Sequence, residues 1–341
     1  MISLKYKENS IHICDIVKKR EKPKPVYYYY DVDDSLLSEP DSYASLLKSS
    51  LPEIKEKLKV NQSVVDSAIE LIQKNKEPDH EASAPIRKAY YFLKKKSREL
   101  LREEIDLRDV SERAQVNIPS KLDEWPGTWF VAGSSGSGKG HFVCSTILRH
   151  WRTSSPLNRR HVWYVTPELH EDKTLRMISD TKKYEDYFHG IDVSHDTFDK
   201  SELSSEEFFN QNIKGILDSQ RNVICVFDDC QDAGGNLPTL IRKYVDRLLR
   251  TGRHNGTSTW TLQHSLRNSA FSRQAVQSCK HIVLFCRSQR GKCTTFLKDS
   301  VGLSLKQSRE LVQLMATSSR SAVLRMHSPM ALISESFVKL L

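Results

Sequence analysis

From about residue 117 onward, short apolar runs alternate with stretches of helical spacing. The runs have the length of strands and are rich in β-branched and aromatic residues. They predict strands at 128–132, 161–165, 223–227, 258–262, 281–286 and 322–326. Because the intervals leave room for crossover helices, we expect an α/β fold with a mainly parallel sheet covered by helices. The polar interval from about 167 to 220 is expected to form helices and loops outside the sheet.

The first 115 residues follow a different pattern, so we divide the chain into an extension, 1–115, and a main domain, 116–341. Residues 11–17 predict a short strand. The two prolines of KKREKPKPVYYYYDVDD favour an extended linker, and its tyrosines favour a strand or a partner contact over stacking on bases. Helical spacing predicts one helix from Ser63 that ends before Pro78 and a second over 86–105, which makes the extension mostly helical.

The positive charge of the chain is confined to one stretch. Between His264 and Met330, eleven Lys and Arg residues face two acidic ones, a net +9 that equals the net charge of the whole chain. This local excess favours a polyanionic partner such as nucleic acid, and a solvated basic face is the plainer alternative. No apolar run is long enough to span a membrane.

The seven cysteines show no pattern and fit a reducing, intracellular compartment. Four residues that lie close together in the sequence have spacings that match no zinc site, so core or incidental roles are favoured. They are Cys279, His281, Cys286 and Cys293.

A glycine-rich turn follows the first strand of the main domain. TWFVA runs into GSSGSGKG, in which Gly133, Gly138 and Lys139 match G-x-x-x-x-G-K, and residues 141–150 read as the next helix. In this arrangement backbone N–H groups and the helix N-terminus bind phosphate oxygens, while the lysine bridges the β- and γ-phosphates. The predicted phosphate-binding segment is Gly133, Ser134, Ser135, Gly136, Ser137, Gly138, Lys139, Gly140 and His141.

Gly140 stands where this motif expects a serine or threonine, whose hydroxyl binds Mg²⁺. Phosphate binding by the backbone and the lysine survives the change, but the direct protein ligand for the metal is lost. Two consequences stay open: a water held by Asp228 replaces the hydroxyl, or the site binds nucleotide and hydrolyses it slowly or not at all.

A second acidic element follows about 90 residues later. RNVICVFDDC reads as a buried strand that ends in Asp228 and Asp229. Carboxylates at the carboxyl end of a parallel strand face the crevice where ligands bind. We interpret the pair as a Walker B element, in which Asp228 holds Mg²⁺ through water and Asp229 orients or deprotonates the attacking water.

The next strand carries candidate sensor and arginine residues. A helix from Pro238 ends at Gly252, and a strand over 258–262 places Gln263 at its end, where the amide can bond the γ-phosphate or the attacking water. Arg253 and Arg250 are expected at the exposed end of the helix. Either can supply a guanidinium to a neighbouring subunit's site, with a surface ion pair as the alternative. His254 and His264 flank the strand; either can contact phosphate, and a structural role is favoured for both.

These motifs resemble one known family. GSSGSGKG, CVFDDC, TGRHNGTSTWTLQHS, LRNSAF and HIVLFCR occur in the order and spacing of the FtsK–HerA-type viral DNA-packaging ATPases, which serve poxviruses and other large cytoplasmic DNA viruses. The resemblance covers about residues 122–330. Gly140 and residues 1–115 depart from the family pattern.

The resemblance implies an ASCE-type, RecA-like P-loop ATPase that binds ATP and Mg²⁺. It implies that Lys139 is the Walker A lysine, Asp228 and Asp229 the Walker B pair, and Gln263 the sensor. Arg253 and Arg267 match family arginines, and Arg267 is a candidate trans arginine or DNA contact. The implied partners are double-stranded DNA, further copies of the chain in a ring, and a capsid or portal-vertex protein. The implied location is the host cytoplasm or viral factory, with virion association.

The sequence therefore indicates two candidate functions. The first is an ATP-driven translocase that packages a viral genome into its capsid. The second is a nucleotide-binding assembly or scaffold module with weak or absent hydrolysis, motivated by Gly140. A small-molecule kinase with the same loop is disfavoured by the GRH…Gln strand and by the basic stretch.

Overall fold

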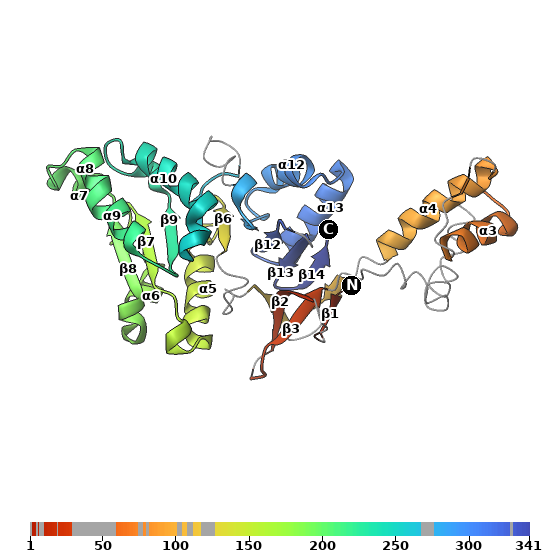
Figure 1. The fold of residues 1–341 in the computed structure, drawn as a ribbon, viewed down its shortest axis with the longest axis horizontal. Helices are drawn as coiled ribbons and strands as arrows, with labels where there is room; N and C mark the ends of the chain where they lie inside the picture. The colour runs from red at the N-terminus through yellow and green to blue at the C-terminus, as the bar shows by residue number, and fades with distance from the viewer. Residues whose placement is uncertain are drawn as a thin grey trace. The chain divides into compact units, whose positions relative to one another are not determined.

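Nine strands between residues 128 and 340 lie in one sheet of the computed structural model (Figure 1). The structure describes residues 2–4, 6, 10–18, 20–28, 59–73, 78–79, 82–100, 104–107, 112–116, 127–266, 276–327 and 330–341. Two compact units are present. The larger unit comprises Cys14–Pro23 and Asp106–Val338, and the smaller comprises Met1–Ile13, Lys24–Ile105 and Lys339–Leu341.

The order of the strands in the larger unit is β14-β13-β12-β11-β6-β10-β9-β7-β8. Parallel pairing runs from β11 to β8, whereas β11 with β12 and β12 with β13 are antiparallel. The strands are β6 Thr128–Ala132, β7 Val162–Thr166, β8 Phe188–Asp192, β9 Ile224–Asp228, β10 Ser258–Gln263, β11 His281–Leu284, β12 Ala322–Arg325, β13 Ala331–Ser334 and β14 Phe337–Leu340.

Helices cover both sides of the parallel strands (Figure 1). Right-handed crossovers put helices on one face when the chain moves one way along the sheet and on the other face when it moves back. Accordingly α5 and α6 lie on one side of the strands and α7 to α10 on the other. The helices of this unit are α5 Lys139–Thr153, α6 Arg176–Ser179, α7 His195–Lys200, α8 Ser205–Phe209, α9 Gly215–Ser219, α10 Leu237–Thr251, α12 Arg290–Val301 and α13 Leu305–Ser318.

The predicted α/β fold, a mainly parallel sheet covered by helices, is confirmed, and all six predicted strands are present. Three expectations were wrong in detail. The interval 167–220 contributes β8 at the sheet edge, a strand whose polar sequence FHGID gives no buried-strand pattern. The strand expected over 281–286 ends at Leu284, because residues 286–288 turn toward α12. The antiparallel strands β13 and β14 follow the last predicted strand and were not predicted.

A ladder of aromatic rings crosses the centre of the sheet. Trp129 on β6 lies directly opposite Trp260 on β10 and His281 on β11. Its ring stacks on the Trp260 ring with centroids 4.6 Å apart and on the His281 ring at 4.2 Å. Burial lowers the pKa of His281 well below its ordinary value, so the imidazole is neutral in this core. These cross-strand contacts fix the register of the two strands that flank β6.

The smaller unit contains a helical hairpin and a short strand pair. In α3 Gln62–Gln73 and α4 Ala84–Leu100, the buried side chains of Val65, Ala68, Ala89, Tyr90 and Leu93 form one apolar cluster. The second helix ends at Leu100 rather than at residue 105. The expected proline linker is instead a strand, β3 Lys24–Tyr28, paired antiparallel with β1 Ile2–Ser3.

Three short strands complete the described chain. They are β2 Ile11–Lys18, β4 Glu104–Asp106 and β5 Glu112–Gln115. Within the larger unit, β5 pairs antiparallel with residues 15–18 of β2. Among the described residues, no helix combines the length and the apolar character that crossing a bilayer requires.

Candidate nucleotide site

The glycine-rich segment forms a tight turn between β6 and α5. Gly138 has φ of 105°, a left-handed conformation that strains any residue with a Cβ. At Gly133 a Cβ would collide with Ser137 Oγ and with the Phe285 ring, so no side chain fits there. The Gly133 N–H donates to the carbonyl of Gln263 at 3.0 Å, which fastens the turn to the end of β10. Ser137 Oγ is buried inside the turn, against Gly133, and has no hydrogen-bond partner there.

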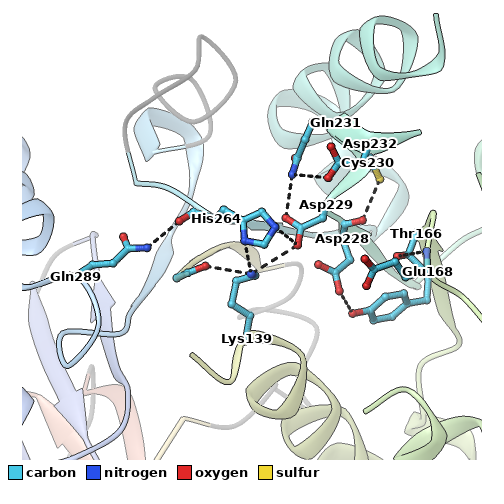
Figure 2. Close-up of polar contacts among 12 residues, drawn as sticks. Lys139, Thr166, Glu168, Asp228, Asp229, Cys230, Gln231, Asp232, His264 and Gln289 are labelled. Carbon is cyan, nitrogen blue, oxygen red and sulfur yellow. Dashed lines mark hydrogen bonds and ion pairs between the residues drawn. The ribbon is translucent and has the colours of Figure 1, made fainter. Parts of the chain in front are cut away.

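Lys139 joins the turn to the neighbouring strand ends (Figure 2). Its Nζ donates to the Gly133 carbonyl at 3.0 Å and lies 3.6 Å from Asp229 Oδ2. It also lies 3.3 Å from His264 Nδ1, and His264 Nε2 is 3.1 Å from the same Asp229 oxygen. A neutral imidazole with its hydrogen on Nε2 satisfies both contacts, because Nδ1 then accepts from the ammonium and Nε2 donates to the carboxylate.

Asp228 and Asp229 share a strand end but occupy different surroundings. Asp228 is 9% exposed and accepts a hydrogen bond from the Tyr164 hydroxyl at 2.6 Å. Burial raises the pKa of its carboxyl to about 7, and the neighbouring Asp229 and Asp172 add to the rise, against the opposing effects of Tyr164 and Lys139. Asp228 is therefore an acid whose charge depends on what binds beside it.

Asp229 leaves the strand in a left-handed conformation, with φ of 44°. Aspartate tolerates this region better than most residues, at a modest cost in free energy. The turn directs the Asp229 carboxylate toward Lys139 and His264, while Asp228 points toward Tyr164 (Figure 2). The two adjacent carboxylates thus face different partners.

These groups line a cavity of about 720 Å³ at the carboxyl ends of the parallel strands. Its charged lining comprises Lys139, Lys173 and Arg320 against Glu168, Asp172, Asp228, Asp229 and Asp232. No group of three or more His, Cys, Asp or Glu residues within the described ranges is arranged to hold a metal ion by itself. A metal here would need ligands from phosphate and water, which is how Mg²⁺ commonly binds beside nucleotides.

A second cavity, of about 340 Å³, adjoins the first and shares Gly138, His141 and Arg320 with it. Its lining combines the apolar side chains of Phe285, Val323 and Ile333 with polar groups that include those of Gln115, Ser145 and Glu335. Arg320 lies at the junction, where its Nε donates to the Ser137 carbonyl at 3.0 Å and its Nη2 to the Gly136 carbonyl at 3.4 Å. The two cavities lie on opposite sides of the P-loop, toward β9 and toward β12.

The structure brings together most of the predicted site residues. The whole segment from Gly133 to His141 lies at this edge of the sheet, with Asp228 and Asp229 beside it. Gln263 contacts the turn only through its backbone carbonyl, which accepts the Gly133 N–H. Its side chain lines a separate cavity toward α10, with Pro238 and Ile241. The residue that reaches Lys139 and Asp229 is His264, which was expected to be structural.

Several cavity residues were not predicted. His264 is one position past Gln263, so strand alternation, which turns successive side chains to opposite sides, was a usable signal. Arg320 and Asp172 line the cavity, and the buried Tyr164 contributes only through its bond to Asp228; all three come from distant parts of the chain and carry no local motif. Their approach to the P-loop depends on the order of the strands.

The predicted arginines lie away from this cavity. Arg253 is exposed in the turn Gly252–Asn255 that precedes β10, so it lies at the amino end of the strand. The six-residue strand β10 spans about 20 Å. Arg253 therefore lies about that far from the carboxyl edge of the sheet, where the cavity of its own chain is found. Arg250 forms an ion pair with Asp246. Arg267 lies outside the described residues.

Solved structures that the chain resembles include nucleotide-binding ATPases. The genome packaging NTPase B204 of Sulfolobus turreted icosahedral virus 2, in complex with sulfate, is 10% identical with a TM-score of 0.42, and the match covers 61% of this chain and 96% of that one. The cytoplasmic domain of the Thermomonospora curvata type VII secretion ATPase EccC is 11% identical with a TM-score of 0.37, over 69% of this chain and 29% of that one. The pCW3 conjugation coupling protein TcpA, in its monomer form with ATPγS, is 12% identical with a TM-score of 0.34, over 68% and 65%.

A viral genome packaging NTPase is thus among the solved proteins to which this chain is similar. No protein-family model matches the sequence, and no curated protein does. Support for an activity therefore lies in the residues of the site.

The raised pKa of Asp228 makes the stability of the nucleotide-free protein depend on pH. Its pKa is about 7 in the fold and about 3.9 in an unfolded chain, so between these values the folded state holds a proton that the unfolded state releases. The free energy of unfolding should fall as pH rises from about 4 to about 7, by up to about 1.4 kcal/mol per pH unit from this group. In Asp228→Asn that contribution should vanish. Urea unfolding of both proteins at pH 5, 6, 7 and 8 measures the difference, and parallel stability curves would contradict the assignment.

Proposed function

We propose that the chain is an ATP-driven motor that moves double-stranded DNA into a viral capsid. The observation that carries the proposal is the contact of Lys139 with Asp229 and His264 at the carboxyl edge of the sheet, between the P-loop and the acidic strand end. This edge places a lysine, a carboxylate and a polar strand end around one phosphate-sized space. Phosphoryl transfer requires that arrangement.

Hydrolysis would use the residues of this edge in separate roles. The P-loop N–H groups and Lys139 would bind the β- and γ-phosphates in place of the contacts that Lys139 now makes. Asp229 would accept the proton of a water that attacks the γ-phosphorus, and the ADP oxygen would leave. His264 bonds both Lys139 and Asp229, so we assign it the sensing role that the sequence suggested for Gln263, whose backbone carbonyl anchors the loop.

Mg²⁺ fits the donor set of this cavity. Asp228 lies at the end of β9 on the same edge, and its buried carboxylate would hold the ion's water shell. The ion would neutralise negative charge on the phosphate oxygens. The protein's own contribution is to keep Asp228 oriented through the Tyr164 hydroxyl.

The second cavity would receive the nucleoside. With the γ-phosphate near Asp229 and the β-phosphate at Gly138, the rest of a nucleotide must continue past Arg320 to the side of β12. An apolar wall with amide and hydroxyl groups suits a base and a ribose. This second space supports ATP, rather than inorganic polyphosphate, as the ligand.

DNA and a neighbouring subunit would use the opposite edge of the sheet. Arg253, Lys280 and Arg325 lie close enough there for the two arginines to lower the pKa of Lys280, after the larger effect of burial. This basic edge is suited to a phosphate backbone or to a neighbour's nucleotide. In a ring, Arg253 would act in trans, the basic stretch would contact DNA, and a capsid or portal-vertex protein would bind the assembly in the host cytoplasm or viral factory.

A nucleotide-binding scaffold is the second candidate, and Gly140 favours it. Without a hydroxyl at position 140, the site would bind ATP and turn over slowly. The two candidates differ in turnover with duplex DNA, and in the response to Gly140→Ser. That change should alter activity little in a motor and raise it sharply in a scaffold.

Substitution of the two charged residues should separate binding from hydrolysis. Lys139→Ala should lose ATP affinity and turnover, because it removes the cation that bridges the phosphates. Asp229→Asn should bind ATP but hydrolyse it about 10²- to 10⁴-fold more slowly, because the proton acceptor is lost. ATP hydrolysis with and without duplex DNA, together with equilibrium binding, measures both effects. Unchanged turnover in both variants would refute the site, and turnover that ignores DNA would favour the scaffold.

Filling the second cavity should exclude the nucleoside alone. Ser145→Trp puts a large ring into that space from α5 and should weaken ATP binding about tenfold or more, while the affinity for inorganic triphosphate stays unchanged. Thr153→Trp, on the exposed end of the same helix, is the matched control. The placement of the nucleoside would be contradicted if Ser145→Trp lowered the affinities for ATP and for inorganic triphosphate equally, or lowered neither.

Complementation tests whether Arg253 acts on a neighbour. Arg253→Ala alone should lower DNA-stimulated ATP hydrolysis roughly 10³-fold. Coexpression with Asp229→Asn should restore part of the activity, since those subunits supply an arginine to intact sites. Lys243→Ala on α10 removes another exposed cation and is the control. Mixed assemblies that show no recovery would exclude a role in trans.

A further inference from the structure

The P-loop of this chain lacks the side chain whose hydroxyl usually contacts the metal, and another oxygen lies at that place. A Cβ on Gly140 would lie 3.6 Å from Asp172 Oδ2 and 3.6 Å from Cβ and Cγ2 of Thr174. These are ordinary van der Waals distances. A serine hydroxyl would extend only one bond from that Cβ, so Asp172 presents a carboxylate oxygen in the space that a P-loop hydroxyl normally occupies.

The Asp172 carboxylate is held in this position by its own loop. Oδ1 accepts the N–H of Thr174 at 2.7 Å, and the Asp172 carbonyl accepts the N–H of Leu175 at 3.2 Å. These bonds fix the segment between β7 and α6 beside the start of α5. The other carboxylate oxygen, Oδ2, is the one that faces Gly140.

The acidic lining of the cavity favours a cation that binds together with the nucleotide. Five carboxylates line it against three Lys and Arg side chains, and a triphosphate adds further negative charge. Repulsion would oppose binding unless a divalent ion lies between the carboxylates and the phosphates. Mg²⁺ typically takes one or two carboxylates, phosphate oxygens and several waters, which matches a site that holds no protein-only metal cluster within the described residues.

We propose that Asp172 replaces the missing P-loop hydroxyl and holds, together with Asp228, the hydrated Mg²⁺ that enters with ATP. The inference rests on the proposed nucleotide site and adds the residue that compensates for Gly140. It places the metal contact on the loop after β7 instead of on the P-loop helix.

The test compares nucleotide affinity with and without metal. In wild-type protein, Mg²⁺ should strengthen the binding of ATPγS relative to binding in EDTA. In Asp172→Asn this enhancement should fall about tenfold or more, the size of effect expected for a group that supports a metal. Affinity in EDTA should be unchanged or higher, because one repulsive charge is gone. Asparagine keeps an oxygen that can accept from Thr174, so the loop should stay folded.

Two further variants make the result specific. Asp232→Asn removes the same charge from the same cavity but does not face Gly140, so it should keep the Mg²⁺ enhancement. Gly140→Ser in the Asp172→Asn background should restore it, because a side chain fits at that position. The electron paramagnetic resonance spectrum of Mn²⁺ bound with ATPγS gives an independent readout of the metal's ligands.

Three outcomes would overturn the inference: an enhancement in Asp172→Asn equal to that of wild type, an equal loss in Asp232→Asn, or no recovery with Gly140→Ser. Failure of the wild-type protein to bind ATPγS at all would instead contradict the proposed function, and the inference would fall with it.

Discussion

The contact between the Lys139 ammonium and the Asp229 carboxylate is the interaction on which the site depends. It joins the first residue of α5 to the end of β9 across the end of β10, and His264 bridges the two groups. A cation and a carboxylate held at 3.6 Å in a partly buried cleft are stabilised more strongly than an exposed pair would be. A phosphate that enters the cleft would replace one favourable contact of the lysine with another, so little rearrangement is needed for the ligand to bind.

The two edges of the sheet have different proposed roles. At the carboxyl edge, the P-loop, the two aspartates and the adjoining cavities supply the features that a nucleotide needs. At the amino edge, Arg253 lies with Lys280 and Arg325, about one strand length away. In the proposed ring, this separation allows one subunit's hydrolysis to depend on its neighbour. The register of β6, β10 and β11, fixed by the ladder of Trp129, Trp260 and His281, sets the distance between the edges.

Much of the sheet could be predicted because buried parallel strands are continuous apolar runs, as TWFVA and VICVF are. The edge strand FHGID was missed because half of its surface is exposed and its polar residues hide the pattern. In the site, Lys139, Asp228 and Asp229 belong to contiguous motifs and were found. Asp172, Tyr164 and Arg320 reach the P-loop only through the strand order, which no local pattern contains. For His264 a structural role was favoured over a phosphate contact, whereas the structure places its imidazole against Lys139 and Asp229.

The most direct test of this account is a crystal structure of the protein with ATPγS and Mg²⁺. The account predicts the γ-phosphate between Lys139 and Asp229, the Lys139–His264 contact replaced by a lysine–phosphate bond, and the base beyond Arg320 beside Phe285. A nucleotide found elsewhere, or a P-loop that keeps its present Lys139 contacts at saturating ligand, would contradict it.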